Sequence, residues 1–342
     1  MSPPSKAPAP APAPDPLRSL KMFVAGAMAG AISRTATAPV DRTRMLMQTH
    51  VGERMTLTQA YKVMASEMKQ SNVGVAAFFK GNLANCLKIA PETAIKLTMY
   101  DSLKTHVLDW RRQQQQLAYE SHVASIQHTS PAYTLTMTPQ NVTPPTDTAV
   151  SLYAHERLVL GAVSGAVGQL TVYPLEMVRT RIAVAPTGMY EGVSHAIFSV
   201  AQREGVGALY RGVGASMLGI LPYAGVDLMI FEGLKKRMLT AYDTPPPALN
   251  FVSGMVASCV AQFVAYPFAL VRTRLQKQGM IEGDTTRYRG IVDCFSQTVR
   301  NEGILGLYKG LLPNVLKLAP AAGINWLVFE QAKLSMGIDA RS

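Results

Sequence analysis

Charged residues are scarce in this chain. They make up 16% of its 342 residues, whereas a typical soluble protein has roughly 25%. The mean hydropathy is slightly positive. This composition excludes an intrinsically disordered chain, because such chains combine high charge with low hydrophobicity. It is typical of a membrane protein that carries some polar residues inside.

The chain also lacks the patterns of metal, redox and catalytic sites. Cys86, Cys259 and Cys294 have neither zinc-site nor CxxC spacing, and the six histidines form no ligand cluster. We interpret the cysteines as small apolar core residues. No Walker loop, GxGxxG or GxSxG motif is present. We therefore expect neither an enzyme nor a protein with a bound metal or cofactor.

Long basic runs are absent as well, although the net charge is +11. Lysine and arginine are spread thinly, mostly at the ends of apolar segments, and no pattern of stacking aromatics accompanies them. This argues against a nucleic-acid partner. Attraction to anionic lipid and to small anionic solutes explains the positive charge more simply.

The N-terminus shows no targeting pattern. Residues 1–17 form a Pro/Ala-rich tail that we expect to be extended and disordered. The tail has neither the arginine-rich amphipathic pattern of a transit peptide nor the apolar core of a secretory signal. Any targeting signal is therefore expected to be internal.

The chain does contain three related repeats. A first motif surrounds a proline in "APVDRTRML", "YPLEMVRTR" and "YPFALVRTR", a second reads "FFKG", "LYRG" and "LYKG", and a third reads "YDSLK", "FEGLK" and "FEQAK". The glycine of the second motif and the aromatic residue of the third are 19 residues apart each time. Such register predicts repeats at 18–110, 152–241 and 242–342. An inserted loop, 111–151, separates the first two.

Each repeat contains two long apolar segments. They run over 20–49 and 82–108, 153–183 and 213–240, and 247–278 and 311–336. These lengths exceed the ~20 residues that a membrane span needs. Charged residues interrupt the second segment of each repeat, so we expect a hydropathy scan to underrate it. The predicted fold is all-α, with six transmembrane helices in three pseudo-symmetric repeats and a short amphipathic surface helix in each repeat.

The three motifs together resemble those of the mitochondrial carrier family over residues 18–336. The stretches "SRTATAPVDRTRMLMQ" and "LGILPYAGVDLMIFEGLK" are most similar to the ATP-magnesium/phosphate carriers. The resemblance implies a monomeric, multi-pass protein of the mitochondrial inner membrane. It would exchange adenine nucleotides, with or without magnesium, for phosphate or another nucleotide. The chain has no EF-hand loop, so calcium control is not expected.

We call the first long helix of each repeat an odd helix and the second an even helix. The resemblance implies that charges after the three odd-helix prolines close the cavity on the matrix side. Asp41 would pair with Arg179, and Glu176 with Arg272. Ala269 stands where a third acid is expected, so Arg44 would lack its partner. We call these six positions the matrix ring; Gln48 and Gln276 match the glutamines that brace such pairs in relatives. The alternative is an ordinary intrahelical pair at the membrane edge.

A second set of charges follows the second helix of each repeat. The resemblance implies a cytoplasmic gate made of Asp101, Lys104, Glu232, Lys235, Glu330 and Lys333, and the alternative is helix-end charges at the lipid headgroups. The glycines of the second motif would each start a helix, which suits an anionic phosphate. In the family these sites hold cardiolipin. The alternative for Gly81, Gly212 and Gly310 is a plain helix-start turn.

Substrate contacts should break the threefold symmetry, because a substrate is not itself threefold symmetric. Positions in register with the even-helix prolines, together with one on the first helix, give Arg34, Lys88, Glu92, Lys96, Gly219, Ile220, Asp227 and Lys317. Charges at this depth usually line a cavity. Their net positive charge favours an anion, and the resemblance implies that an adenine ring rests on Gly219–Ile220. Alternatively, Lys88, Glu92 and Lys96 form a self-satisfied ladder on one helix face.

Other functions fit part of this pattern. A carrier of coenzyme A or adenosine 3',5'-bisphosphate shares much of it, although coenzyme A carriers tend to have an uncharged residue at the position of Asp227. A proton or ion leak protein would leave the Gly219–Ile220 step unexplained. A receptor or scaffold without transport would leave the charges at both ends without a role.

Overall fold

The computed structural model describes residues 16–70, 74–129, 152–241, 246–280 and 288–337. The regular elements in these ranges are helices. The first helix of each repeat is unbroken: α1 (Pro16–Thr49), α5 (Ala154–Val184) and α8 (Pro247–Lys277). The second is α3 and α4 (Asn82–Leu87, Ile89–Thr129), α7 (Val213–Ala241), and α10 and α11 (Leu311–Leu316, Leu318–Ser335).

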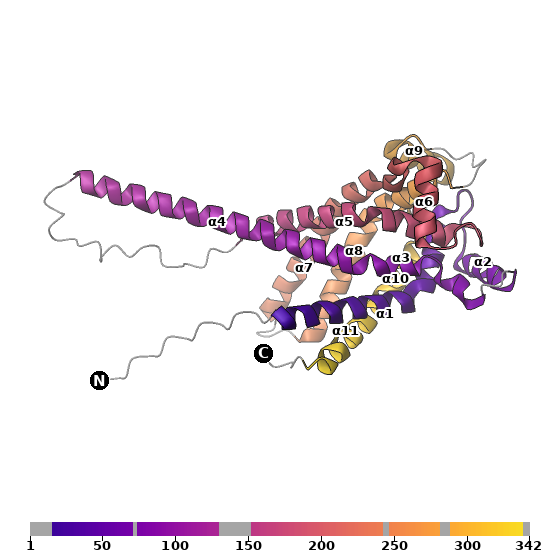
Figure 1. Ribbon diagram of the computed structural model, residues 1–342, viewed down its shortest axis with the longest axis horizontal. Helices are drawn as coiled ribbons and strands as arrows, with labels where there is room; N and C mark the ends of the chain where they lie inside the picture. The colour runs from indigo at the N-terminus through magenta and orange to yellow at the C-terminus, as the bar shows by residue number, and fades with distance from the viewer. Residues whose placement is uncertain (1–15, 71–73, 130–151, 242–245, 281–287, 338–342) are drawn as a thin grey trace.

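Short helices join the two long helices of each repeat. They are α2 (Leu57–Gln70), α6 (Val193–Glu204) and α9 (Ile291–Glu302), each followed by a short 3₁₀ segment: η1 (Gly74–Phe79), η3 (Val206–Tyr210) and η4 (Ile304–Tyr308). Figure 1 shows α2, α6 and α9 at the end of the bundle where α3 and α10 also lie. The long helices diverge toward the other end, where α1 begins and α11 ends. The predicted surface helices are thus confirmed.

The repeats are joined side by side through their long helices. α4 packs against α5, α7 against α8, and α11 against α1. Each of these contacts joins two different repeats, so the three repeats close into a ring. The predicted arrangement of six spans in three pseudo-symmetric repeats is confirmed.

Hydropathy alone identifies only part of this bundle. In the described residues, four helical stretches are long and apolar enough to cross a membrane: His155–Val184, Val206–Thr240, Ala248–Lys277 and Ile304–Ser335. The two remaining long helices, α1 and α4, are not apolar enough to be identified in this way, and both belong to the first repeat. The expectation that the second helix of every repeat would be underrated is therefore wrong for α7 and α11, whose apolar windows contain few charges.

The inserted segment is not the loop predicted from Arg111 onward. α4 continues to Thr129 and projects beyond the bundle in Figure 1. The physical reason is local, because glutamine, leucine, alanine and arginine favour helix and neither proline nor glycine occurs between Pro91 and Pro131. Residues 130–151 and the tail at 1–15 lie outside the described residues.

Three glycines fix how each even helix starts against a neighbouring repeat. Gly81, Gly212 and Gly310 have φ angles of 81°, 84° and 80°, which residues other than glycine rarely adopt. A Cβ atom on them would lie 2.7–3.0 Å from the carbonyl oxygen of a ring arginine: Arg179, Arg272 and Arg44, in that order. The second motif thus lets the even helix approach the ring closely.

The even-helix prolines act differently in the three repeats. α3 and α4 are separated at Lys88, and α10 and α11 at Lys317, each three residues before a proline that cannot donate a backbone hydrogen bond. α7 runs through Pro222 without a break. The repeat without a lysine at this position is therefore also the repeat with a continuous helix.

Candidate functional site

The two complete pairs of the matrix ring are present. Arg179 Nη2 donates to Asp41 Oδ2 over 2.9 Å, and Arg272 Nη1 lies 3.0 Å from Glu176 Oε1. Both carboxylates are buried, and each pair joins two repeats. The structure therefore brings together the residues that the sequence predicts to pair, and the intrahelical alternative does not describe them.

Two lysines predicted to bind substrate also contact the ring. Lys317 Nζ donates to Asp41 Oδ1, and Lys88 Nζ lies 3.5 Å from Glu176 Oε2. Each ring acid is thus shared by an arginine of an odd helix and a lysine at the break in an even helix. The sequence analysis placed these lysines in the cavity wall and did not foresee this contact. Their role in substrate binding stays a prediction.

Each acid position of the ring, with the cations that it faces, forms one sector. The third sector has Ala269 at the acid position, so it has no acid. Arg44 Nη1 donates to Asn314 Oδ1 over 2.7 Å, and the Arg44 guanidinium lies 5.8 Å from the centre of the Tyr266 ring. Ala269 occupies the position of the missing carboxylate. An amide and an aromatic face replace a full counter-charge here.

The glutamines expected to brace the ion pairs contact tyrosines. Gln48 Nε2 donates to Tyr266 Oη over 2.9 Å, and Gln276 Nε2 donates to Tyr173 Oη over 3.0 Å. Each tyrosine in turn donates to a backbone carbonyl of the second motif, in Lys309 or Arg211. The glutamines therefore tie odd helices to even-helix starts and act on the ion pairs only indirectly. Tyr173 and Tyr266 directly precede Pro174 and Pro267, and that register could have identified them.

A further set of ion pairs was not predicted. In each repeat a carboxylate on the surface helix binds an odd-helix arginine and the basic residue of the second motif. These triads are Glu67 with Arg42 and Lys80, Glu204 with Arg181 and Arg211, and Glu302 with Arg274 and Lys309. Glu204 and Glu302 each stand directly before a glycine, and this repeated Glu-Gly pattern could have identified the triads from the sequence. In repeat 1 that signal is absent, because Val73 precedes Gly74.

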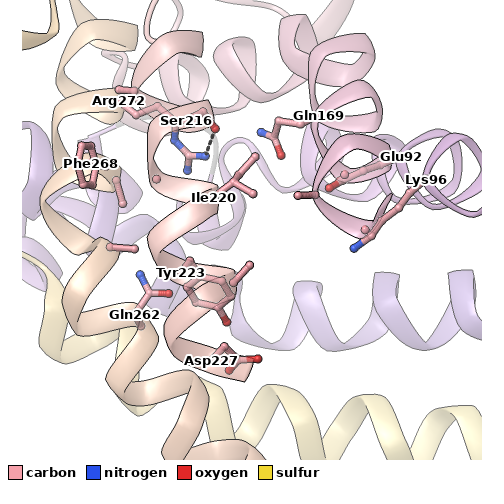
Figure 2. Close-up of a pocket in the computed structure, with 18 of the residues that line it drawn as sticks. Glu92, Lys96, Gln169, Ser216, Ile220, Tyr223, Asp227, Gln262, Phe268 and Arg272 are labelled. Carbon is pink, nitrogen blue, oxygen red and sulfur yellow. Dashed lines mark hydrogen bonds between the residues drawn. The ribbon is translucent and has the colours of Figure 1, made fainter. Parts of the chain in front are cut away.

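A cavity of about 600 Å³ lies between α4, α5, α7 and α8. Figure 2 shows the side chains of residues that line it. Five residues of the predicted substrate set line it: Glu92, Lys96, Gly219, Ile220 and Asp227. Residues that the sequence analysis did not assign also line it, among them Arg157, Gln169, Ser216, Tyr223, Gln262 and Phe268. The ring arginines Arg44 and Arg272 lie among its lining residues as well.

The other predicted substrate residues do not line this cavity. Arg34 donates to the backbone and side-chain oxygens of Asn85, and the two lysines contact the ring as described. The proposed ladder is present only in part. Lys88 lies 3.6 Å from Glu92, but among the described residues Lys96 forms no ion pair. Asp227 accepts a hydrogen bond from Ser258 over 3.0 Å.

The charges predicted to form the cytoplasmic gate are apart in this structure. Glu330 and Lys333 pair within α11 over 2.8 Å. The remaining four are exposed: Asp101, Lys104, Glu232 and Lys235. Among the described residues, none of the six gate charges forms an ion pair with another repeat. The end with the ring is thus closed by ion pairs, and the divergent end is not.

A threefold bundle of helices with buried charges at one end and a central cavity defines a solute-carrier architecture. The sequence matches the mitochondrial carrier protein family in three consecutive stretches, at residues 15–110, 151–242 and 243–339. The chain belongs to this family, and it is accordingly a multi-pass protein of the mitochondrial inner membrane. The predicted resemblance is confirmed.

Relatives within the family carry more specific names. The chain is 37% identical over 327 residues to the mitochondrial adenyl nucleotide antiporter SLC25A25 of Mus musculus, and 34% identical over 322 residues to SLC25A24 of the same species. It is 36% identical to the calcium-binding mitochondrial carrier protein SCaMC-2-A of Danio rerio. Each match covers 93% of this chain but only 58–60% of the relative. The chain therefore spans about three-fifths of the length of these relatives.

Proposed function

We propose that this chain exchanges adenine nucleotides for phosphate or for another nucleotide across the inner membrane. The observation that carries this proposal is the cavity, whose lining includes the ring arginines Arg44 and Arg272 together with the apolar step at Gly219–Ile220. Cationic groups favour phosphate, since arginine can bind it with two parallel hydrogen bonds. Further along α7, Ile220 and Tyr223 offer an apolar and aromatic surface for a purine ring.

Alternating access follows from the two ends of the bundle. The matrix ring is formed while the predicted cytoplasmic gate is apart, which supports a state closed to the matrix. Transport would break one set of pairs as the other forms. The net contribution of a buried ion pair to one state is small, because the cost of desolvating both charges offsets most of their attraction. Substrate binding that favours one state can therefore shift the balance between them.

The remaining features of this proposal rest on the family resemblance. We expect cardiolipin at the helix starts marked by Gly81, Gly212 and Gly310, and a monomer as the working unit. Magnesium would enter with the nucleotide and not as a resident metal. The names of the relatives support the nucleotide as substrate, because two of them are called adenyl nucleotide antiporters.

The purified protein in liposomes tests this proposal. Labelled ATP should enter liposomes loaded with phosphate, ADP or AMP, with and without magnesium, and should not enter empty liposomes. Uptake driven only by internal coenzyme A or adenosine 3',5'-bisphosphate would favour the alternative carrier. Proton conductance without any nucleotide exchange would show a leak protein and contradict the proposal.

Lys96 offers a specific test of the cavity. Lys96→Ala should raise the KM for ATP about tenfold, because it removes a cation that lines the cavity and has no acidic partner among the described residues. Lys62→Ala is the matched control, since Lys62 is exposed on α2, a helix that contributes no residue to the cavity lining. Equal KM values for both variants and the wild type would mean that the nucleotide binds elsewhere.

A further inference from the structure

The third sector of the ring lacks two opposite charges at once. In the other sectors an acid holds an odd-helix arginine and an even-helix lysine: Asp41 with Arg179 and Lys317, and Glu176 with Arg272 and Lys88. The equivalent positions in the third sector are Ala269 and Gly219. These positions are neighbours, since a Cβ atom on Gly219 would lie 3.2 Å from the Cβ of Phe268.

The space left by the missing pair belongs to the cavity. Both Ala269 and Gly219 line it, and so do the ring arginines on either side of the gap, Arg44 and Arg272. In the other two sectors the corresponding room is filled by a carboxylate and a lysine. The cavity therefore reaches the level of the ring at the one sector where both charged side chains are replaced by small ones.

Hydrogen-bond donors around this gap lack partners. Among the described residues, four buried side-chain polar atoms have no hydrogen bond: Arg44 Nε, Arg272 Nε, Asn314 Nδ2 and Glu92 Oε2. Three of the four are donors at or beside the gap. Arg44 and Asn314, which holds it, belong to the third sector, and Arg272 borders the gap from the neighbouring one. Buried polar groups are rarely left unpaired, and each such group calls for an explanation.

We propose that the gap at Ala269 and Gly219 is an anion subsite, which binds the terminal phosphate of the nucleotide between Arg44 and Arg272. This inference rests on the proposed function and says where one end of that substrate lies. The substrate supplies the negative charge that Ala269 does not. Arginine suits this role, since its planar group binds phosphate oxygens through two donors.

The same placement connects binding with the ring. Arg272 already lies 3.0 Å from Glu176 and donates to Ser216 over 3.3 Å, as Figure 2 shows for the serine. A phosphate at the gap competes with Glu176 for the donors of Arg272. Occupation of the subsite therefore weakens one of the two complete ring pairs. A substrate that lacks a terminal phosphate loses this effect.

Ala269→Asp tests the subsite, because the new carboxylate occupies the gap and pairs with Arg44. The KM for ATP should rise at least tenfold, and the rise should be smaller for AMP, which carries less charge. Ala224→Asp is the matched control. It adds the same charge to the cavity lining on α7, away from the ring. Ala269→Asn separates the effect of size from that of charge and should change the KM less than Ala269→Asp does.

Thermal melting of the purified protein provides a readout that does not need transport. Inorganic phosphate and ATP should each raise the melting temperature of the wild type, and Ala269→Asp and Arg44→Gln should each abolish that rise. An equal rise in all three proteins overturns the subsite. So does an Ala269→Asp variant with a lower turnover but an unchanged KM, since the acid would then act on the gate alone. A wild type that exchanges no nucleotide refutes the proposed function, and its melting with phosphate still decides the subsite.

Discussion

Glu176→Gln is expected to destabilise the protein strongly and to abolish exchange. The Glu176 side chain is 6% exposed and accepts hydrogen bonds or ion pairs from Arg272, Lys88 and Gln169. Without its charge, the largely buried Arg272 loses its counter-ion, and Lys88 keeps only Glu92, 3.6 Å away. Breaking a buried pair in this way costs about 3–5 kcal/mol. Thermal melting in detergent measures the loss, and nucleotide uptake into liposomes measures the effect on transport.

The control for this prediction is an exposed pair of the same chemistry. Asp109 and Arg112 lie 3.0 Å apart on α4, with side chains 58% and 60% exposed. Asp109→Asn should change the free energy of unfolding by less than about 1 kcal/mol. Asp41→Asn should resemble Glu176→Gln, since Asp41 also holds a ring arginine and a lysine. Similar melting of Glu176→Gln and Asp109→Asn would contradict the role given to the ring.

The register of the prolines explains why much of the fold and the ring could be predicted. Motifs that recur at fixed distances identify equivalent positions in the three repeats from the amino-acid sequence alone. The pairing of Asp41 with Arg179 came from the resemblance to the family, because the closure of a ring alone leaves both Arg179 and Arg272 as possible partners. The continuous helix at 111–129 shows the opposite case. No repeat register covers it, and the helix preference of its glutamine, alanine and arginine residues was the only signal.

The reach of long side chains could not be predicted in the same way. Lys88 and Lys317 were assigned to the cavity by helix face, but a lysine side chain at a helix break can extend to the ring acids. Symmetry also failed for the triads in repeat 1. Repeats 2 and 3 place an arginine seven residues after the proline, at Arg181 and Arg274, whereas repeat 1 uses Arg42, one turn earlier. A search by register misses such a displaced partner.

Glu302→Gln is the second change with a large expected effect. Glu302 is 1% exposed and lies 2.8 Å from Arg274 and 2.5 Å from Lys309, which are nearly as buried. The triad links the surface helix α9 to α8 and to the start of α10. Its loss leaves two buried cations unpaired, which should cost about 3–5 kcal/mol. Glu67→Gln is the matched variant in repeat 1. Glu67 is 21% exposed, so the loss should be smaller.

The pH dependence of melting distinguishes this charge effect from a packing defect. Burial alone would raise the pKa of Glu302, but hydrogen bonds from Arg274 and Lys309 outweigh burial and hold the pKa below its ordinary value. A carboxyl whose pKa is lower in the folded state stabilises the protein above its unfolded pKa, about 4.3, and this contribution is lost as the pH falls through the folded pKa. The melting temperature of Glu302→Gln should therefore fall less steeply than that of the wild type below about pH 4.3. Parallel acid limbs for the two proteins would mean that Glu302 is not held as a carboxylate, and the triad would then stabilise the fold by packing alone.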